Sequence, residues 1–272
     1  LQASSSNLTP AAAAERPGKI TCRARKRILL LCAGPDSREN SLVNLFKIRG
    51  YEAVNYDIEN GQACDLADTA IYEEMIRAVA AGDYLACFAS PDCSTFSKLL
   101  NLPGGPPVLR GNSGRERYRL KAYTNGPKKG QPLTKEDQEK VRRHTLVAGR
   151  VAQTLDMFHE RGLPFGYETP EILKDQVSMG NLDEFLALRA KENVRHIVGL
   201  QCPFGGDAAK PTSWIVHLLD FDDMPNECKH DKRLWFNDRD GSVVSKRHKP
   251  SCGTATYTLQ DTSASGWGSK PD

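Results

Sequence analysis

The chain has 272 residues and a mass of 30.0 kDa, enough for one large domain or two small ones with a buried core. Its 37 lysines and arginines stand against 34 aspartates and glutamates, which excludes a polybasic, histone-like protein but leaves room for a local basic surface. The composition is that of a globular protein. We expect no membrane partner, because no apolar run approaches the roughly 18–20 residues of a membrane helix.

Eight cysteines are spread along the chain without a Cys-x-x-Cys pair, too sparsely for a disulfide scaffold. Cys32 and Cys87 lie in apolar runs, where a reduced thiol packs as a small hydrophobic group. We therefore expect a reducing intracellular compartment, which would be the nucleus in a eukaryote. A cysteine in a polar turn is then a candidate for chemistry.

Residues 1–26 are rich in Ser, Ala, Pro and Arg, with Glu15 as their one acid, and this composition predicts a disordered lead-in. A targeting segment is the alternative. The chain begins at Leu1, which would also fit a piece of a longer polyprotein.

Strands and helices alternate from Arg27 onward. The expected order is strand 27–32, helix 41–49, strand 52–56, helix 68–81, strand 84–89, helix 134–161, strand 164–167, helix 182–191, strand 194–201 and strand 214–219. This alternation predicts an α/β fold with a mostly parallel, twisted sheet and helices on both faces. The carboxyl ends of the strands then share one edge, where ligands bind. We expect residues 27–220 to form this domain and 221–272 a small irregular C-terminal element.

The turn after each of the first strands carries residues suited to a nucleotide-like cofactor. Ala33 and Gly34 follow the first strand, and Asp57 ends the second, where a carboxylate can accept hydrogen bonds from ribose hydroxyls. Asp65 could receive an adenine amino group. The alternative is that these aspartates are ordinary helix caps.

A cysteine follows the third strand in the turn Pro91-Asp92-Cys93-Ser94-Thr95-Phe96-Ser97. A thiol at the ligand edge is a candidate nucleophile if its surroundings favour the thiolate. Cys93, Phe96 and Ser97 resemble, in their spacing, the nucleophile motif of the cytosine-C5 DNA methyltransferases. Glu168-Thr169-Pro170 is similar to a second motif of that family, Glu-Asn-Val or Glu-Asn-Pro, with Thr169 in place of Asn.

The resemblance covers roughly residues 27–220, and Asp92 and Ser94 depart from the usual motif. The segments 201–205 and 210–212 are similar to divergent, phage- or mobile-element-like members. The resemblance implies a Rossmann-like methyltransferase fold that transfers a methyl group from S-adenosylmethionine (SAM) to C5 of cytosine in DNA. The target base must leave the stack for this chemistry.

The resemblance also implies roles for individual residues. Cys93 would add to C6 of cytosine, Glu168 would bind N3, and Arg195 would lie near the target base. SAM would be bound by a set of residues on the first three turns: Ala33, Gly34, Asp57, Asp65 and Pro91.

The stretch 101–132 interrupts the alternation and is strongly basic, which is typical of a loop that closes over phosphates. A solvated charged loop is the alternative. The residues expected to contact nucleic acid are Ser97, Arg110, Arg115, Arg117 and Lys121.

The C-terminal element carries a Cys-x-His…His-x-x-x-Cys set, Cys228, His230, His248 and Cys252. Two thiolates and two imidazoles suit tetrahedral Zn²⁺, and a metal would stabilise a segment with little core. The alternative is that the four are unrelated surface residues.

We expect a monomer that binds DNA in preference to RNA. Two other functions stay open within the same fold, namely a catalytically inactive nucleic-acid-binding module and a methyltransferase for cytosine in tRNA or other RNA. A different class is a cysteine hydrolase that pairs Cys93 with His144, His159 or His196.

Overall fold

A computed structural model of the chain describes residues 27–96, 107–112, 117–174, 176–200, 211–221, 228, 233–237, 242–246 and 257–259. The predicted disordered lead-in 1–26 and the segment 201–205 lie outside this part of the chain.

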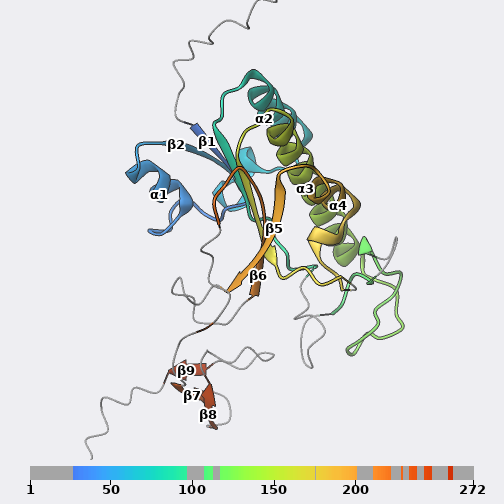
Figure 1. Cartoon of the computed structure of the whole chain (residues 1–272). Coiled ribbons are helices and arrows are strands. Elements are labelled where there is room, and N and C mark those ends of the chain that lie inside the picture. The colour runs from blue at the N-terminus through green and yellow to red at the C-terminus, as the bar shows by residue number, and fades with distance from the viewer. Residues whose placement is uncertain are drawn as a thin grey trace, which may run out of the picture.

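The main domain follows the predicted alternation closely (Figure 1). Its elements are β1 (Arg27–Leu31), α1 (Leu42–Ile48), β2 (Glu52–Tyr56), α2 (Thr69–Ala81), β3 (Ala86–Ala89), α3 (Lys135–Glu160), β4 (Phe165–Pro170), α4 (Asp183–Arg189), β5 (Val194–Leu200) and β6 (Pro211–His217). The short 3₁₀ helices Ile58–Asn60, Gln62–Cys64 and Met179–Asn181 lie in the connections.

The helix boundaries follow from readable capping residues. Ser41, Asp68 and Thr134 precede α1, α2 and α3, and the side-chain oxygen of each accepts a backbone N–H of the first turn. Gly82 ends α2 in the left-handed region, with a φ of 84°, which glycine adopts without steric cost.

Six strands form one sheet in the order β2-β1-β3-β4-β6-β5. The pairings from β2 to β4 are parallel, whereas β6 runs antiparallel to both β4 and β5. The fold is therefore α/β with a mixed sheet, compatible with a Rossmann-like arrangement. The expectation of a mostly parallel sheet missed the reversal at β6, because the apolar run that predicts a strand carries no information about its direction.

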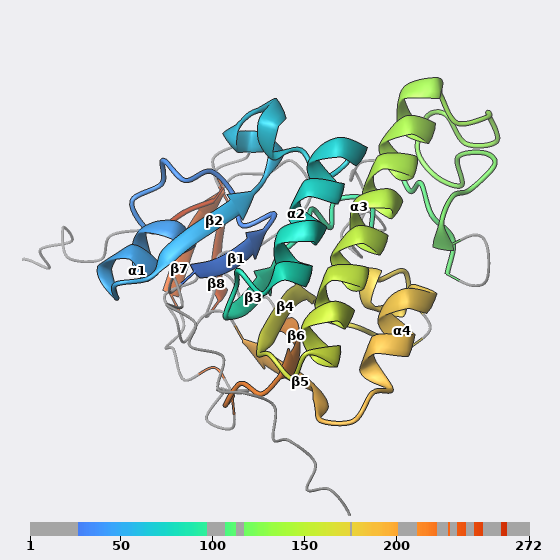
Figure 2. The same cartoon turned by 90° about the horizontal axis from the view of Figure 1, so that it is seen from above.

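Helices cover both faces of the sheet, as expected (Figure 2). On one face, α2, α3 and α4 pack over the main core, which includes Leu29, Cys87 and Tyr167. On the other face, Phe46 of α1 contacts a smaller cluster around Leu30. Together these layers fix the positions of the strand ends that carry the predicted site.

The C-terminal element contains a three-stranded antiparallel sheet, in the order β8-β7-β9. Its strands are β7 (Arg233–Asn237), β8 (Val243–Lys246) and β9 (Tyr257–Leu259). The part of this element that is described is thus more regular than the sequence indicated. Across the described residues, no helix is both long and apolar enough to cross a bilayer.

Candidate functional site

A cavity of about 410 Å³ lies at the carboxyl ends of β1, β2 and β3, beside α3. Its volume falls within the usual range for small-molecule sites. The five residues predicted to bind a cofactor all line it: Ala33, Gly34, Asp57, Asp65 and Pro91. The cavity therefore lies at the sheet edge that the strand–helix alternation predicted to bind ligands.

The turn after β1 forms one wall of this cavity with an unusual backbone. Cys32 has a φ of 56°, a conformation that is uncommon for residues other than glycine, and Gly34 has a φ of 80°. The Gly34 N–H donates a 2.8 Å hydrogen bond to Asp57 Oδ2, while Asp57 Oδ1 accepts from the N–H of Glu59. Asp57 therefore caps the helical turn that follows it and also ties β1 to β2.

A network of amide and carboxylate groups from β2 and the connection after it holds the same turn in place. Asn55, almost fully buried, donates to the carbonyl of Gly34 at 2.8 Å and to Asp36 Oδ1 at 2.7 Å. Asn60 donates to the same oxygen of Asp36 at 3.0 Å. The turn carries only one glycine, and these side chains supply the support. The sequence indicated one of these side chains, since Asn55 is a polar residue in the interior of a strand.

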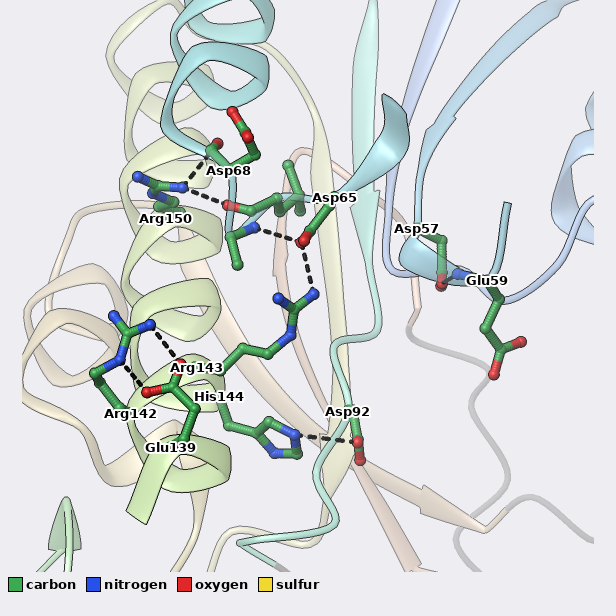
Figure 3. Close-up of polar contacts among 12 residues, drawn as sticks. Asp57, Glu59, Asp65, Asp68, Asp92, Glu139, Arg142, Arg143, His144 and Arg150 are labelled. Atoms are coloured by element: carbon green, nitrogen blue, oxygen red, sulfur yellow. Dashed lines mark hydrogen bonds and ion pairs between the residues drawn. The ribbon is translucent and has the colours of Figure 1, made fainter. Parts of the chain in front are cut away.

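The acid at the far side of the cavity is paired with a cation from α3. Arg143 donates to Asp65 Oδ1 at 2.6 Å, and the same oxygen accepts the N–H of Ala67 at 2.7 Å (Figure 3). Arg143 was not among the predicted site residues. Its place on the cavity wall follows from the register of α3, which the sequence alone did not orient.

The cysteine turn lies next to this cavity, of which Pro91 and Asp92 form part of the wall. Asp92 Oδ1 accepts the N–H of Ser94 at 2.6 Å, and the N–H of Phe96 donates to the carbonyl of Cys93 at 2.8 Å. Cys93 and Cys32 are both half-buried and Cys87 is buried, and burial raises the pKa of the Cys32 and Cys87 thiols. The turn thus presents a partly accessible thiol on a fixed backbone.

The glutamate predicted from the second motif lies on the neighbouring strand end. Ser90 Oγ donates a 2.6 Å hydrogen bond to Glu168 Oε2, because β3 and β4 are parallel neighbours and end together. Burial raises the pKa of the phenol of Tyr167, the residue before Glu168 on β4.

His144 is the histidine that contacts the cysteine turn. Its Nδ1 lies 3.2 Å from Thr95 Oγ1 and its Nε2 lies 3.4 Å from Asp92 Oδ2 (Figure 3). Burial lowers its pKa below the ordinary value of 6.5, which outweighs the opposing effect of the Asp92 carboxylate. The hydroxyl of Thr95 also accepts a hydrogen bond from Arg110 Nε at 3.0 Å. The lowered pKa favours the neutral imidazole at neutral pH.

The other two histidines of the hydrolase alternative lie elsewhere. The ring of His159 packs against that of His217, with centroids 4.6 Å apart, and His196 Nε2 contacts Ser213 Oγ at 2.8 Å on β6. The cavity lining includes neither.

Arg110 was expected to contact phosphates on the surface, but it lies inside the protein. It is 1% exposed, and its guanidinium donates to Thr95 Oγ1, to Thr145 Oγ1 and to three backbone carbonyls, those of Arg117, Tyr118 and Val141. It also lies 3.7 Å above the Phe96 ring. This side chain anchors the basic loop to the cysteine turn and is too deeply buried to contact a phosphate.

Further basic residues follow Arg110 on the loop and on α3, and we call the exposed ones among them the basic surface. Residues 117–150 contain ten lysines and arginines against three carboxylates. Lys121 is exposed, and Arg117 is half-buried with one nitrogen on the carbonyl of Asn181 at 2.6 Å. Ser97 and Arg115 lie outside the described residues.

Arg195, expected near the target base, is separated from the cysteine turn by the register of the sheet. It pairs with Val216, which pairs with Gly166, two positions before Glu168 on β4. Its guanidinium donates to the carbonyl of Leu219 at 2.7 Å. β5 is also the edge strand, so the structure does not bring Arg195 together with Cys93 and Glu168.

Of the four predicted zinc ligands, the structure describes Cys228 alone; His230, His248 and Cys252 lie outside the described residues. In the described part, no group of three or more His, Cys, Asp and Glu side chains is arranged to hold a metal ion. The zinc site stays a prediction.

Comparisons with known proteins identify no relative. The sequence matches no protein-family model, and no curated protein or solved structure is significantly similar to it.

Proposed function

We propose that this protein transfers a methyl group from SAM to C5 of cytosine in nucleic acid, with Cys93 as the nucleophile. The observation that carries the proposal is the Ser90–Glu168 hydrogen bond, at 2.6 Å. It joins the strand ends that bear the two motif residues, directly beside a cavity lined by the five residues predicted to bind SAM. DNA is the proposed substrate, with RNA as the second choice.

The cavity residues have donors and acceptors that fit SAM. Each carboxylate oxygen of Asp57 accepts one backbone N–H and has a further lone pair for a ribose hydroxyl. Two ion pairs lie on the wall, Arg143 with Asp65 and Arg38 with Glu59, and their charges match those of the carboxylate and ammonium groups of an amino acid. When bound, SAM supplies an electrophilic methyl group on a sulfonium.

The protein residues supply the activation of cytosine in this proposal. The Cys93 sulfur forms a bond to C6 while the carboxyl of Glu168 holds a proton at N3, so that negative charge does not build up on the ring. C5 then becomes nucleophilic and would form a bond to the methyl carbon as the bond from that carbon to the sulfonium sulfur breaks, which leaves S-adenosylhomocysteine. Loss of the C5 proton to solvent and breakage of the S–C6 bond restore the aromatic ring and return the Cys93 thiolate.

The basic surface at residues 117–150 supplies the phosphate contacts that the reaction requires, because the base must be held outside its stack. Lys121, Lys128 and Lys129 are exposed on it. This surface does not depend on Arg110.

The test is covalent trapping. The protein is incubated with labelled SAM and an oligonucleotide that contains 5-fluorocytosine, whose fluorine cannot leave as a proton does. We expect an SDS-stable protein–DNA adduct with the wild type and with Cys64→Ser, which replaces a half-buried thiol outside the cavity lining, and none with Cys93→Ser.

The other outcomes separate the alternatives. SAM binding without an adduct on DNA or RNA would identify an inactive nucleic-acid-binding module. An adduct on RNA alone would assign the substrate to RNA. Absence of SAM binding would reject both methyltransferase-based functions.

A further inference from the structure

Arg110 is a buried cation with no acidic partner among the described residues. Its guanidinium is bonded to two hydroxyls and three carbonyls, all of them neutral. Burial lowers its pKa to about 9, so it remains charged at neutral pH. A buried charge without a counter-ion costs several kcal/mol, because dipoles replace water only in part. A negative charge nearby would offset this cost.

The anion is not a substrate phosphate, because Arg110 is 1% exposed and its guanidinium is enclosed by the protein. The thiolate of the cysteine turn is the candidate that we consider, because Arg110 contacts two residues of that turn. Arg110 Nε bonds to Thr95 Oγ1, two residues after Cys93, and the guanidinium stacks on Phe96 of the same turn at 3.7 Å. The side chain is thus fixed to the backbone that carries the sulfur.

We propose that Arg110 is a positioning residue for Cys93, supplying the buried positive charge that stabilises its thiolate. This inference rests on the proposed role of Cys93 as nucleophile. A cation beside a cysteine is the usual means by which proteins generate a reactive thiolate at neutral pH.

The other groups around the turn do not replace this charge. Asp92 on the turn and Glu168 on β4 are carboxylates, and the Tyr167 phenol is uncharged at neutral pH. His144 contacts the turn but is neutral, since burial lowers its pKa. Arg143 is paired with Asp65, and Lys140 is exposed to solvent, where salt screens its charge.

The experiment measures the alkylation rate of Cys93 by iodoacetamide between pH 5.5 and 10, read from the Cys93 peptide by mass spectrometry. Alkylation needs no SAM and no nucleic acid, so its result is independent of methyl transfer. Arg110→Met is expected to raise the midpoint of the rate–pH profile by about one unit, which lowers the rate at pH 7 about tenfold. Arg110→Lys, which keeps the charge, is expected to restore most of the rate.

The matched control is Arg142→Met, which removes an arginine from the exposed face of α3 where it pairs with Glu139. It is expected to leave the profile unchanged, and the Cys64 peptide serves as an internal reference in every variant. A folded Arg110→Met protein with the wild-type profile would overturn the proposal.

A measurement on the wild type covers the case in which Arg110→Met does not fold. A buried charge is screened little by salt. The Cys93 midpoint is therefore expected below the ordinary value of about 8.5 and unchanged in about 0.5 M NaCl. A midpoint at or above the ordinary value would contradict the proposal without any variant.

Discussion

Ser90 and Glu168 are 78 positions apart in the chain and share a 2.6 Å hydrogen bond. The contact exists because β3 and β4 pair in parallel, with Ala89 opposite Tyr167, so that the next residue of each strand emerges at the same edge. Three residues beyond Ser90 lies Cys93. The pairing of two strands thus places the cysteine turn and the Glu168 carboxyl group at the same edge of the sheet.

A substitution at Gly34 tests whether the cavity beside the Ser90–Glu168 contact binds SAM. Its φ of 80° strains any other residue, so Gly34→Ala is expected to destabilise the fold by about 1 kcal/mol. The same change distorts the wall that carries the N–H bonded to Asp57, and we expect SAM affinity to fall about tenfold. Calorimetric titration and urea unfolding measure the two effects.

Gly130 is the matched control, since it has a φ of 84° and open space around a Cβ, in the basic loop. Gly130→Ala is expected to cost similar stability and leave SAM binding unchanged. Equal losses of affinity in the two variants would show that the effect comes from general destabilisation.

His144 predicts a pH dependence of stability. Burial lowers its pKa in the folded protein, so between that pKa and 6.5 the unfolded chain binds more protons than the native one. The free energy of unfolding therefore falls as pH drops from 6.5 through the folded-state pKa and is constant above that window. His144→Gln is expected to flatten this part of the curve, measured by urea unfolding from pH 5 to 8. His196, whose pKa is also lowered by burial, contributes in the same direction and remains in the variant as a reference. An unchanged slope would contradict the neutral, buried assignment of His144.

Lys128 and Lys129 test the basic surface. Both are exposed, so their replacement by glutamine is expected to leave the fold and SAM binding intact. Binding to a single-stranded oligonucleotide should weaken. The plot of log affinity against log salt should become shallower, its slope smaller in magnitude by roughly 1–2, because up to two phosphate contacts are lost.

A double variant of α1, Lys47→Gln with Arg49→Gln, removes the same charge from the opposite face of the sheet. It is expected to leave the salt slope unchanged. If both double variants behaved alike, the protein would bind nucleic acid through its overall charge and not through this surface.

The order of helices and strands could be predicted because its signals are local. Ser41, Asp68 and Thr134 start helices by capping their own first turns, and Gly82 ends one by its backbone freedom. The ligand edge followed from the same alternation, and its five expected residues do share one cavity.

The features that the sequence did not reveal depend on distant parts of the chain. The sequence of a basic loop does not show which of its arginines is exposed and which is buried. Arg110 lies inside because Phe96 and three carbonyls surround it. Arg195 is separated from the site by the antiparallel β6, whose direction no periodicity encodes. Arg143 and His144 face the cavity because of how α3 packs, which is a property of the whole core.

The most direct measurement of the central claim is the reaction product. The protein is incubated with cytosine-containing single-stranded DNA and SAM that carries a deuterated methyl group, and the digested nucleosides are analysed by mass spectrometry. The account predicts deuterated 5-methylcytosine with the wild type, at least about a hundredfold less with Glu168→Gln, and none with Cys93→Ser. A wild-type protein that binds both SAM and DNA but forms no such product, or a Cys93→Ser variant that forms as much as the wild type, would contradict it.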